Sequence, residues 1–314
     1  MFEKEDKMKK HLSPVLLVIA AAIWGFAFSA QKAAQTIAPF TLGCARSVFA
    51  TVFLVFVIIA FDRIRGTGRR LFSSKKPVDL TRYEIIGGIL SGTALTFATF
   101  FQQFGINAGT DAGKSAFITA LYVVLVPIYA LVLKKRAPLN VWISIAIAVV
   151  GFYFLCITDE FTMVRSDIFV LICALIFPIQ ILCIDKFSPL CDGIRMSLVQ
   201  FITTSLLNLI LALILESPIA IGEVIACILP ILFLGIGSSG IAYTLQIVGQ
   251  KGVNPAAASI LMSLESVFGV VGSAILLGER MSAREYVGCA VVFVAVVISQ
   301  IDFSIFSKKE QKVN

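Results

Sequence analysis

The sequence predicts an all-α integral membrane protein with ten transmembrane helices, arranged as two inverted five-helix repeats, with both termini in the cytoplasm. Three observations predict this class: the composition, the number and length of the apolar runs, and the distribution of Lys and Arg between them. Hydrophobic residues make up 58% of the 314 residues and charged residues 14%, and the mean hydropathy is +0.95. An average soluble domain is about 45–50% apolar and about 25% charged, so this chain would expose extensive apolar patches in water.

Ten apolar runs have the length of about 20 residues that a helix needs to cross roughly 30 Å of hydrocarbon. We expect them at residues 12–30, 39–61, 84–105, 113–133, 139–157, 167–186, 193–215, 224–248, 255–277 and 284–302. The first run follows Lys4, Lys7, Lys9 and Lys10, as a signal peptide would. However, it is long and no clear A-x-A cleavage site follows it, so we expect it to remain as a helix of the mature protein.

The positive residues predict the orientation, because cytoplasmic loops of membrane proteins carry an excess of Lys and Arg. With the N-terminus in the cytoplasm, the inner segments hold twenty of these residues and the outer segments hold five: Lys32, Lys114, Arg165, Arg280 and Arg284. Both termini are therefore expected on the cytoplasmic side. We expect Lys114, at the start of the fourth run, to extend outward to water. The net charge of +7 arises in these loops, so no nucleic acid partner is expected.

Cysteine and histidine give no indication of a metal or cofactor. The seven cysteines (Cys44, Cys156, Cys173, Cys183, Cys191, Cys227 and Cys289) have no CxxC or metal-ligand spacing. Most lie inside apolar runs, and we interpret them as small buried packing residues. His11, the only histidine, precedes the first run. Since no HExxH sequence and no paired acidic site occur among the runs, we expect no cofactor and no enzymatic activity.

An internal repeat relates the two halves of the chain. A shift of 144 residues places residues 101–154 over 245–298 without a gap and gives nine identities, where roughly five are expected by chance. The polar stripes along two of the predicted helices support the repeat more strongly than these identities do. The stripe of the fourth run is Ser115, Thr119, Tyr122, Val126 and Tyr129, and that of the ninth run is Ser259, Ser263, Ser266, Val270 and Ser273. We expect repeats at residues 12–157 and 167–302. Because each holds five spans, an odd number, the second must be inverted.

A weaker pair of stripes follows the third and eighth runs, with Ser91, Thr99 and Gln102 in one and Gly235, Tyr243 and Gln246 in the other. Polar groups gain nothing from facing lipid, so the stripes should face one another or a water-filled cavity. Two interpretations stay open: the side chains line a cavity, or their hydrogen bonds hold neighbouring helices together. Trp24 likewise either walls the cavity or packs. Gln180 and Gln200 are candidate polar groups of the second half.

Two charged residues lie inside the apolar runs, where a charge is costly. Glu265, near the centre of the ninth run, is interpreted as a site for a substrate ammonium or for proton coupling. The alternative is a structural carboxylate that accepts hydrogen bonds. Arg46, about two turns into the second run, is either an anion contact or ion-pair partner, or a packing residue whose charge extends to the surface. Pro127 and Pro178 are expected to interrupt their helices and to provide kinks or gating points.

Several stretches resemble the EamA family of the drug/metabolite transporter superfamily. The first is Ile-Trp-Gly-Phe-Ala-Phe at residues 23–28, followed by Lys32, Pro39 and Arg46. The second is residues 112–127, and the others are residues 255–259, 264–267 and 277–280. The resemblance covers roughly residues 12–302. It implies two inverted EamA repeats around a central cavity lined chiefly by spans 1, 3, 4, 6, 8 and 9, and it implies movement of metabolites, amino acids or drugs, often outward.

This chain departs from the family pattern at two places. Where the family often has Leu-Glu-Pro, this chain has Leu264, Glu265 and Ser266, so the proline kink beside Glu265 is missing. Gln200 takes the position of Arg46 in the second half, which indicates that the halves have diverged. The first departure affects expectations about how the helices would open and close, and neither affects the expected fold.

We therefore expect a secondary active transporter of the cytoplasmic membrane that exports small organic metabolites, such as amino acids or drugs, by alternating access with proton coupling. A passive channel and an integral membrane enzyme are the alternatives. The expected partners are the lipid bilayer and a small-molecule substrate, and monomer and homodimer both stay open. The candidate cavity residues are Trp24, Thr99, Ser115, Thr119, Tyr122, Gln180, Tyr243, Ser259, Ser263 and Ser266, and the charged candidates are Glu265 and Arg46.

Overall fold

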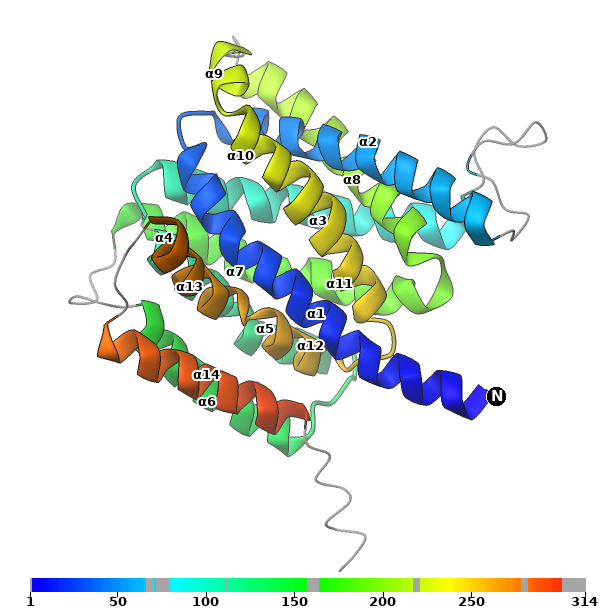
Figure 1. The fold of residues 1–314 in the computed structure, drawn as a ribbon, viewed down its shortest axis with the longest axis vertical. Coiled ribbons are helices and arrows are strands. Elements are labelled where there is room, and N and C mark those ends of the chain that lie inside the picture. The colour runs from blue at the N-terminus through cyan, green and yellow to red at the C-terminus, as the bar shows by residue number, and fades with distance from the viewer. Residues whose placement is uncertain are drawn as a thin grey trace, which may run out of the picture.

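A computed structural model describes residues 2–65, 71, 80–110, 112–156, 164–216, 221–277 and 282–300 (Figure 1). The described residues form helices joined by turns and contain no strand. The helices are α1 (Phe2–Ala33), α2 (Pro39–Arg65), α3 (Arg82–Asn107), α4 (Ala112–Ala120), α5 (Tyr122–Val132), α6 (Leu139–Cys156), α7 (Arg165–Phe187), η1 (Ser188–Leu190), α8 (Gly193–Leu215), α9 (Ile221–Ala226), α10 (Ile228–Leu232), η2 (Phe233–Ala242), α11 (Tyr243–Gly249), α12 (Pro255–Met262), α13 (Glu265–Leu277) and α14 (Ala283–Gln300).

The described helices confirm the ten predicted spans. Nine segments are long and apolar enough to cross a membrane: Leu12–Ala33, Pro39–Ile64, Arg82–Asn107, Lys114–Val132, Arg165–Leu190, Gly193–Leu215, Ile228–Gly249, Pro255–Gly272 and Ala283–Gln300. The shorter apolar helix Leu139–Leu155 is the tenth. The ends differ from the expected ones by a few residues, because apolar composition fades gradually where a helix leaves the hydrocarbon.

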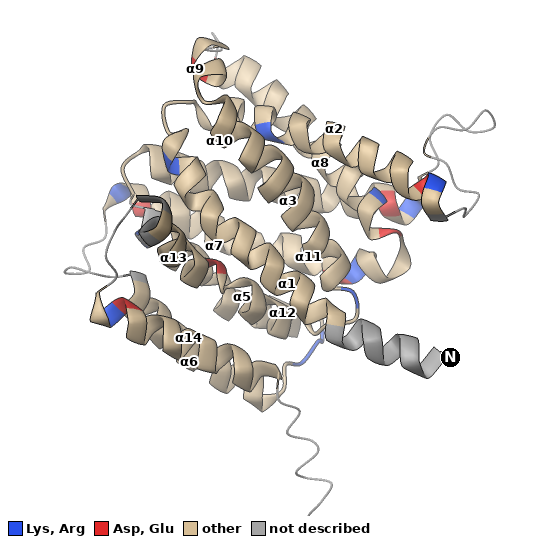
Figure 2. Ribbon diagram, in the orientation of Figure 1, with Lys and Arg blue, Asp and Glu red and all other residues tan. Residues whose placement is uncertain are grey.

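Large apolar side chains are exposed on the outer faces of the bundle. Phe56, Ile214 and Leu229, for example, are 67%, 70% and 75% exposed. Such a surface is unfavourable in water, whereas lipid tails accept it. Most charged side chains lie near helix ends (Figure 2). The outer faces therefore form the lipid-contacting surface.

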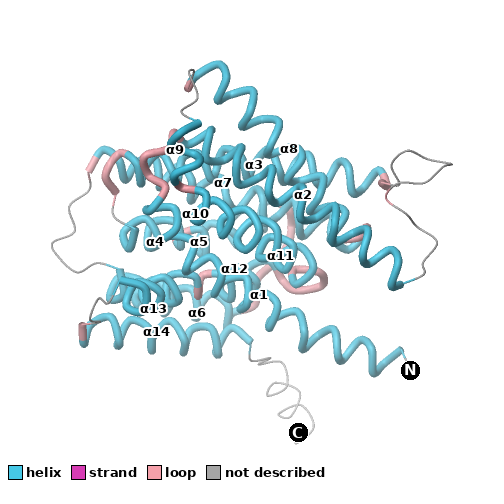
Figure 3. Tube along the Cα trace, turned by 45° about the horizontal axis from the view of Figure 1, so that its top comes forward, coloured by secondary structure: helices cyan, strands magenta, loops and turns pink. Residues whose placement is uncertain are grey.

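The bundle, seen in two views in Figures 1 and 3, contains both antiparallel and parallel helix contacts. The parallel ones include α3 with α8, where Gly87 meets Met196 and Gly92 meets Thr203, and α1 with α13. Four other contacts are antiparallel. In these contacts α6 packs against α14, α2 against α8, α3 against α7, and α1 against η2 and α11. The direction of the α6–α14 pair follows from its two ends: Asn140 donates to the carbonyl of Ser299 at one end, and Gly288 meets Leu155 at the other. These two helices, far apart in the sequence, therefore run in opposite directions.

Glycine permits the closest approaches between helices. A Cβ atom at Gly288 would lie 2.6 Å from the backbone nitrogen of Leu155, and one at Gly25 would lie 2.5 Å from Cβ of Phe268. Real Cβ atoms do not come this close to such neighbours, so α14 and α1 can hold their places only without a side chain there. Small residues at helix contacts are typical of membrane proteins, where close van der Waals packing drives helix association.

The fourth and ninth spans are each interrupted near the middle, which the sequence analysis did not predict. The fourth consists of α4 and α5, separated at Leu121, and the ninth consists of α12 and α13, separated at Ser263 and Leu264. The backbone tightens at both places into hydrogen bonds spanning three residues: Leu121 N to Ile118 O is 3.2 Å, and Leu264 N to Leu261 O is 3.3 Å. Short tight turns of this kind within a helix often mark functional hinges.

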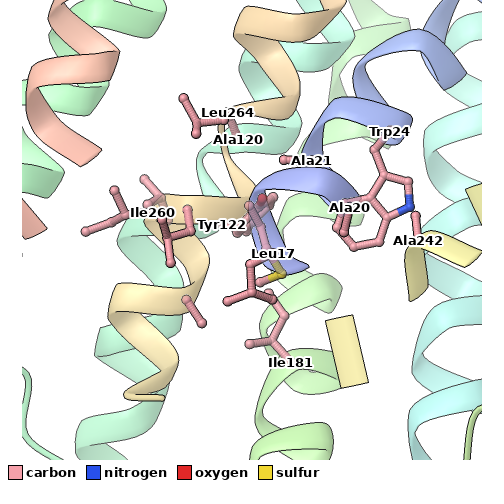
Figure 4. Packing of buried hydrophobic residues seen from close by; sticks show 14 of the residues in the cluster. Leu17, Ala20, Ala21, Trp24, Ala120, Tyr122, Ile181, Ala242, Ile260 and Leu264 are labelled. Atoms are coloured by element: carbon pink, nitrogen blue, oxygen red, sulfur yellow. The ribbon is translucent and has the colours of Figure 1, made fainter. Parts of the chain in front are cut away.

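The predicted proline kinks do not interrupt the helices. Pro127 lies inside α5 and Pro178 lies inside α7, and both helices continue past them. The eighth span changes its winding instead: α10 leads into the π-helical segment η2, which leads into α11. Apolar residues of α1 pack at the centre of the bundle, beside Tyr122, Ile181 and Leu264 (Figure 4). This central position brings α1 next to both interrupted spans.

Candidate functional site

A cavity lies between the helices of the two sequence halves. The space between its wall atoms is about 510 Å³, including the open space at its mouth. Seven of the ten spans contribute to its wall, which consists of Trp24, Ala27, Phe28, Gln31, Arg46, Thr99, Gln102, Thr119, Tyr122, Phe177, Gln180, Ile181, Ser238, Tyr243, Gln246, Met262 and Glu265.

Arg46 brings a positive charge to the cavity from α2. It is 7% exposed, and its Nε and Nη2 atoms donate to the hydroxyls of Ser239 and Ser238, at 3.0 Å each. Both serines belong to η2. The indole of Trp24 donates to the carbonyl of Ser238 at 3.3 Å, and its ring lies 4.7 Å from that of Tyr243 between centroids. An aromatic and polar wall thus surrounds the guanidinium group.

Glu265 brings a carboxyl group to the cavity from the interruption of the ninth span. It is the first residue of α13, and it is 7% exposed. Its carboxyl group interacts with the hydroxyl of Tyr122, the first residue of α5, at the interruption of the fourth span. Oε1 of Glu265 has no hydrogen-bond partner within the described part of the chain. The two mid-membrane turns therefore place an acid and a phenol side by side in the cavity wall.

Two pairs of glutamines join helices at the cavity wall. Gln31 of α1 donates to Gln102 of α3 at 3.0 Å, and Gln102 in turn donates to Thr119 at 3.1 Å. Gln180 of α7 and Gln246 of α11 pair through their amides at 3.2 Å. All four glutamines are buried. Each buried amide thus has the partner that its burial requires.

Eight of the twelve candidate residues line this cavity: Trp24, Arg46, Thr99, Thr119, Tyr122, Gln180, Tyr243 and Glu265. The other four, Ser115, Ser259, Ser263 and Ser266, are buried outside its wall. Whether any of the twelve contacts a substrate stays a prediction.

Three of the four serines outside the wall donate to backbone carbonyls, and the hydroxyl of Ser115 has no partner among the described residues. Ser259 and Ser263 donate to carbonyls of their own helix, both at 2.8 Å, as hydroxyls in helices commonly do. Ser266 donates across to the carbonyl of Ala116 at 3.3 Å, so it joins the fourth and ninth spans. The side chain of Ser273, the end of the predicted stripe, lies outside the described residues. Among these serines of the described chain, Ser266 alone makes a hydrogen bond to another helix, so the two interpretations of the stripes stay open.

The sequence analysis missed Gln31, Ser238 and Ser239. The shift of 144 residues pairs them with Leu175, Ala94 and Leu95, so the comparison of the halves gave no signal. Their polarity could have identified them, because two adjacent hydroxyls, or an amide, are rare inside apolar runs. Gln102 and Gln246, noted only as part of a weaker stripe, both lie in the wall. Gln200 is buried outside the wall, and its amide has no partner among the described residues.

Ion pairs lie at the edges of the bundle, away from the cavity. Lys114 does not extend to water as expected, because its ammonium group pairs with the buried carboxylate of Asp167, which also accepts a hydrogen bond from Thr110 at 3.0 Å. Lys135 pairs with Asp185 near the other end of α7. These two pairs attach α7 to both ends of the fourth span.

The fold and the site define a polytopic helical membrane protein with a cavity of mixed polar and apolar lining among its spans. The model of the EamA-like transporter family matches residues 12–157 and again residues 164–300. The chain therefore belongs to the EamA-like transporter family, of the drug/metabolite transporter superfamily, and is a membrane transporter of that type.

One transporter sequence and one solved structure are similar to this chain over most of its length. An uncharacterized transporter of Archaeoglobus fulgidus is 28% identical over 296 residues, which cover 93% of this chain and 87% of the relative. One similar crystal structure has a description that reads only "crystal structure of protein". It superposes with a TM-score of 0.72, and the match covers 92% of this chain and 96% of the chain in that structure. At 15% sequence identity, that likeness concerns the fold alone.

Proposed function

We propose that this transporter is a secondary active carrier, which binds a small organic solute in the central cavity and exposes it alternately to the two sides of the membrane. One observation carries the proposal: helices of both sequence halves enclose the cavity, and Arg46 and Glu265 lie in its wall. Ionisable groups inside a membrane protein mark substrate or ion pathways. A site between two halves is typical of alternating-access carriers.

The helix contacts support an inverted repeat. If spans 1 to 5 correspond to spans 6 to 10, the contact of α1 with the eighth span corresponds to that of α7 with α3, and both contacts occur. In the same correspondence α2 is equivalent to α8 and α6 to α14, so each of these contacts joins two equivalent helices. The interrupted spans are also equivalent to each other, and they meet where α4 packs against α13 and α5 against α12. Antiparallel pairs that map onto themselves are expected from a two-fold axis in the membrane plane. On this basis the repeats at residues 12–157 and 167–302 are inverted copies.

The glutamine pairs support alternating access because they lie toward opposite ends of the cavity. Gln31 and Gln102 are close to the C-terminal ends of α1 and α3, which run in parallel. Gln180 and Gln246 are toward the C-terminal ends of α7 and α11. Because α7 is antiparallel to α3, these ends are at opposite membrane faces. The first pair has one neutral hydrogen bond and the second has two. Each such bond contributes only about 0.5–1.5 kcal/mol, so either pair can open at low cost.

Energy coupling is assigned to Glu265. The carboxyl group lies in the wall at a helix interruption, where movement of α13 relative to α12 would change its surroundings. A buried carboxyl group that alternates between two environments can take up a proton on one side and release it on the other. The sequence contains no GxxxxGK[ST] nucleotide-binding motif, so a gradient is the energy source that fits this chain.

The direction of transport and the membrane complete the proposal. We place both termini in the cytoplasm, on the excess of Lys and Arg in the segments that then face inward. The chain then lies in the cytoplasmic membrane and exports metabolites such as amino acids or drugs, as many members of its family do.

The test is solute flux into proteoliposomes. A metabolite library is screened against the purified protein by thermal shift, and radiolabelled hits are offered to reconstituted vesicles. A carrier gives saturable uptake of chemically unchanged solute that a proton gradient drives above equilibrium. Flux that is fast, unsaturated and never exceeds equilibrium would indicate a channel. A chemically altered solute would indicate an enzyme.

A further inference from the structure

The guanidinium group of Arg46 has no carboxylate partner among the residues that the structure describes. Its hydrogen bonds are to the hydroxyls of Ser238 and Ser239, and the ion pairs in the described parts of the chain involve other cations. Glu265 lies in the wall of the same cavity, but its carboxyl group interacts with Tyr122. A buried charge without a counter-ion is unfavourable. The cavity therefore offers a positive charge that a bound anion would neutralise.

The surroundings of Arg46 form a built site. Helix α2 and the segment η2 touch through their backbones: a Cβ atom at Gly235 would lie 2.9 Å from the carbonyl oxygen of Arg46. This contact fixes η2 against α2, and the two consecutive serines then hold the guanidinium group through Nε and Nη2. Nη1 is the remaining nitrogen of the fork. π-Helical segments such as η2 are rare and occur frequently at functional sites.

The charge, its supports and the cavity wall together point to one class of ligand. We propose that the solute carried in the proposed transport cycle has an oxyanion group, a carboxylate or a phosphate, which binds to Arg46 as held by Ser238 and Ser239. Guanidinium groups match the planar oxygen pairs of these anions with charge-assisted hydrogen bonds. The rings of Trp24 and Tyr243 beside the site accommodate an apolar body. The inference depends on the cavity being the transport site, and it adds what the substrate must carry.

The test compares ligands that share one apolar body. Binding of 3-phenylpropionate, its amide, 3-phenylpropylamine and 2-phenylethyl phosphate to the purified full chain is measured by titration calorimetry. We expect the carboxylate or the phosphate, or both, to bind at least tenfold more tightly than the amide and the amine. A hydrogen bond to a charged group corresponds to roughly tenfold or more in affinity. Equal responses to all four compounds, including none from any of them, contradict the proposal.

Variants of the site separate binding from folding. Arg46→Gln is expected to lower the affinity for the oxyanion at least tenfold and to leave that for the amide unchanged. Ser238→Ala combined with Ser239→Ala keeps the charge but removes its supports, and it is expected to lower the oxyanion affinity several-fold; this variant decides the question if Arg46→Gln does not fold. An equal loss for oxyanion and amide contradicts the proposal, because it indicates a structural role.

The experiments distinguish failure of the oxyanion-site proposal from failure of the transport proposal. Oxyanion binding that depends on Arg46 without solute flux in vesicles would support the anion site and reject the carrier. Carrier-type flux of amines or neutral solutes, unaffected by Arg46→Gln, would support the carrier and reject the anion site.

Discussion

Glu265 combines three properties at one position: it is buried, it lies in the cavity wall, and one of its oxygen atoms lacks a partner in the described chain. A carboxyl group that only stabilised the fold would be expected to use both oxygens in hydrogen bonds, since an unsatisfied buried acceptor is costly. The open oxygen therefore favours a group that exchanges a proton or contacts a solute.

We predict that Glu265→Gln abolishes transport driven by a pH gradient while the protein still inserts and binds solute. The amide has nearly the shape of the acid but cannot exchange a proton, so only the coupled step is lost. The measurement is uptake into proteoliposomes with and without an imposed pH gradient. Glu285→Gln is the matched control, because Glu285 lies at the start of α14 and accepts a hydrogen bond from the backbone of Ser282. Unchanged gradient-driven uptake in Glu265→Gln would end the coupling hypothesis.

The sequence alone predicted part of the site. The cost of polar groups in hydrocarbon made Arg46, Glu265 and Gln180 candidates, and all three line the cavity. The same cost does not predict whether a hydroxyl makes its hydrogen bond to a solute or to a backbone carbonyl. Ser259 and Ser263 illustrate this limit, because their own helix accepts their hydrogen bonds.

At the scale of elements, the two glutamine pairs are predicted to close opposite ends of the cavity. Gln102→Leu removes the pair with Gln31, and Gln246→Leu, at the corresponding position of the second half, removes the pair with Gln180. Each change removes two neutral hydrogen bonds, because Gln102 also donates to Thr119 and the amides of Gln180 and Gln246 each donate to the other. Each should therefore favour opening on its own side by about five- to 150-fold.

Each of these two variants is the control for the other. Thr99, in the cavity wall, is replaced by cysteine in a chain whose native cysteines have been removed, and the rate of alkylation by a membrane-impermeant maleimide is measured from each side. In the proposed orientation, Gln102→Leu should speed labelling from outside and Gln246→Leu from inside. If both variants speed labelling from the same side, the pairs do not act as opposing closures.

A second prediction concerns the packing of α14 on α6. Gly288→Ala should lower the stability of the protein by about 1–3 kcal/mol, a typical cost of overpacking, because the added Cβ would lie 2.6 Å from backbone nitrogen of Leu155. Gly222→Ala in α9 is the control, since nothing lies within 4 Å of its added Cβ. Thermal unfolding in detergent measures both. A Gly288→Ala protein as stable as the control would show that α14 is not held at this distance.

Span positions were predictable because hydropathy and charge act over a whole helix. The interruptions at Leu121 and at Ser263 and Leu264 were not, because no proline or glycine occupies them. Leu121 corresponds to Glu265 under the shift of 144 residues, so both interruptions occur at nearly the same place in the two halves. Contact between the two interrupted spans, rather than local sequence preference, therefore accounts best for the position of both interruptions.

In the whole molecule, the cavity exists because helices of the two sequence halves pack against one another. The sequence predicted two halves from five spans each and from paired polar stripes, but the partner of each helix follows only from three-dimensional packing. The contact of α1 with η2 brings Trp24 to Ser238, 214 residues further along the chain. The pairing of Arg46 with two serines of η2 likewise has no counterpart within the repeat pattern, so the sequence could not predict it.

If the solute crosses by alternating exposure of one site, the protein must catalyse counterflow, which can be measured in proteoliposomes. Proteoliposomes are loaded with a high concentration of unlabelled solute, and uptake of the labelled form is followed without any gradient of protons. The account predicts a transient accumulation of label above its outside concentration, because each turnover exchanges one bound molecule for another. Label that only equilibrates, at a rate independent of the unlabelled solute inside, would contradict the account.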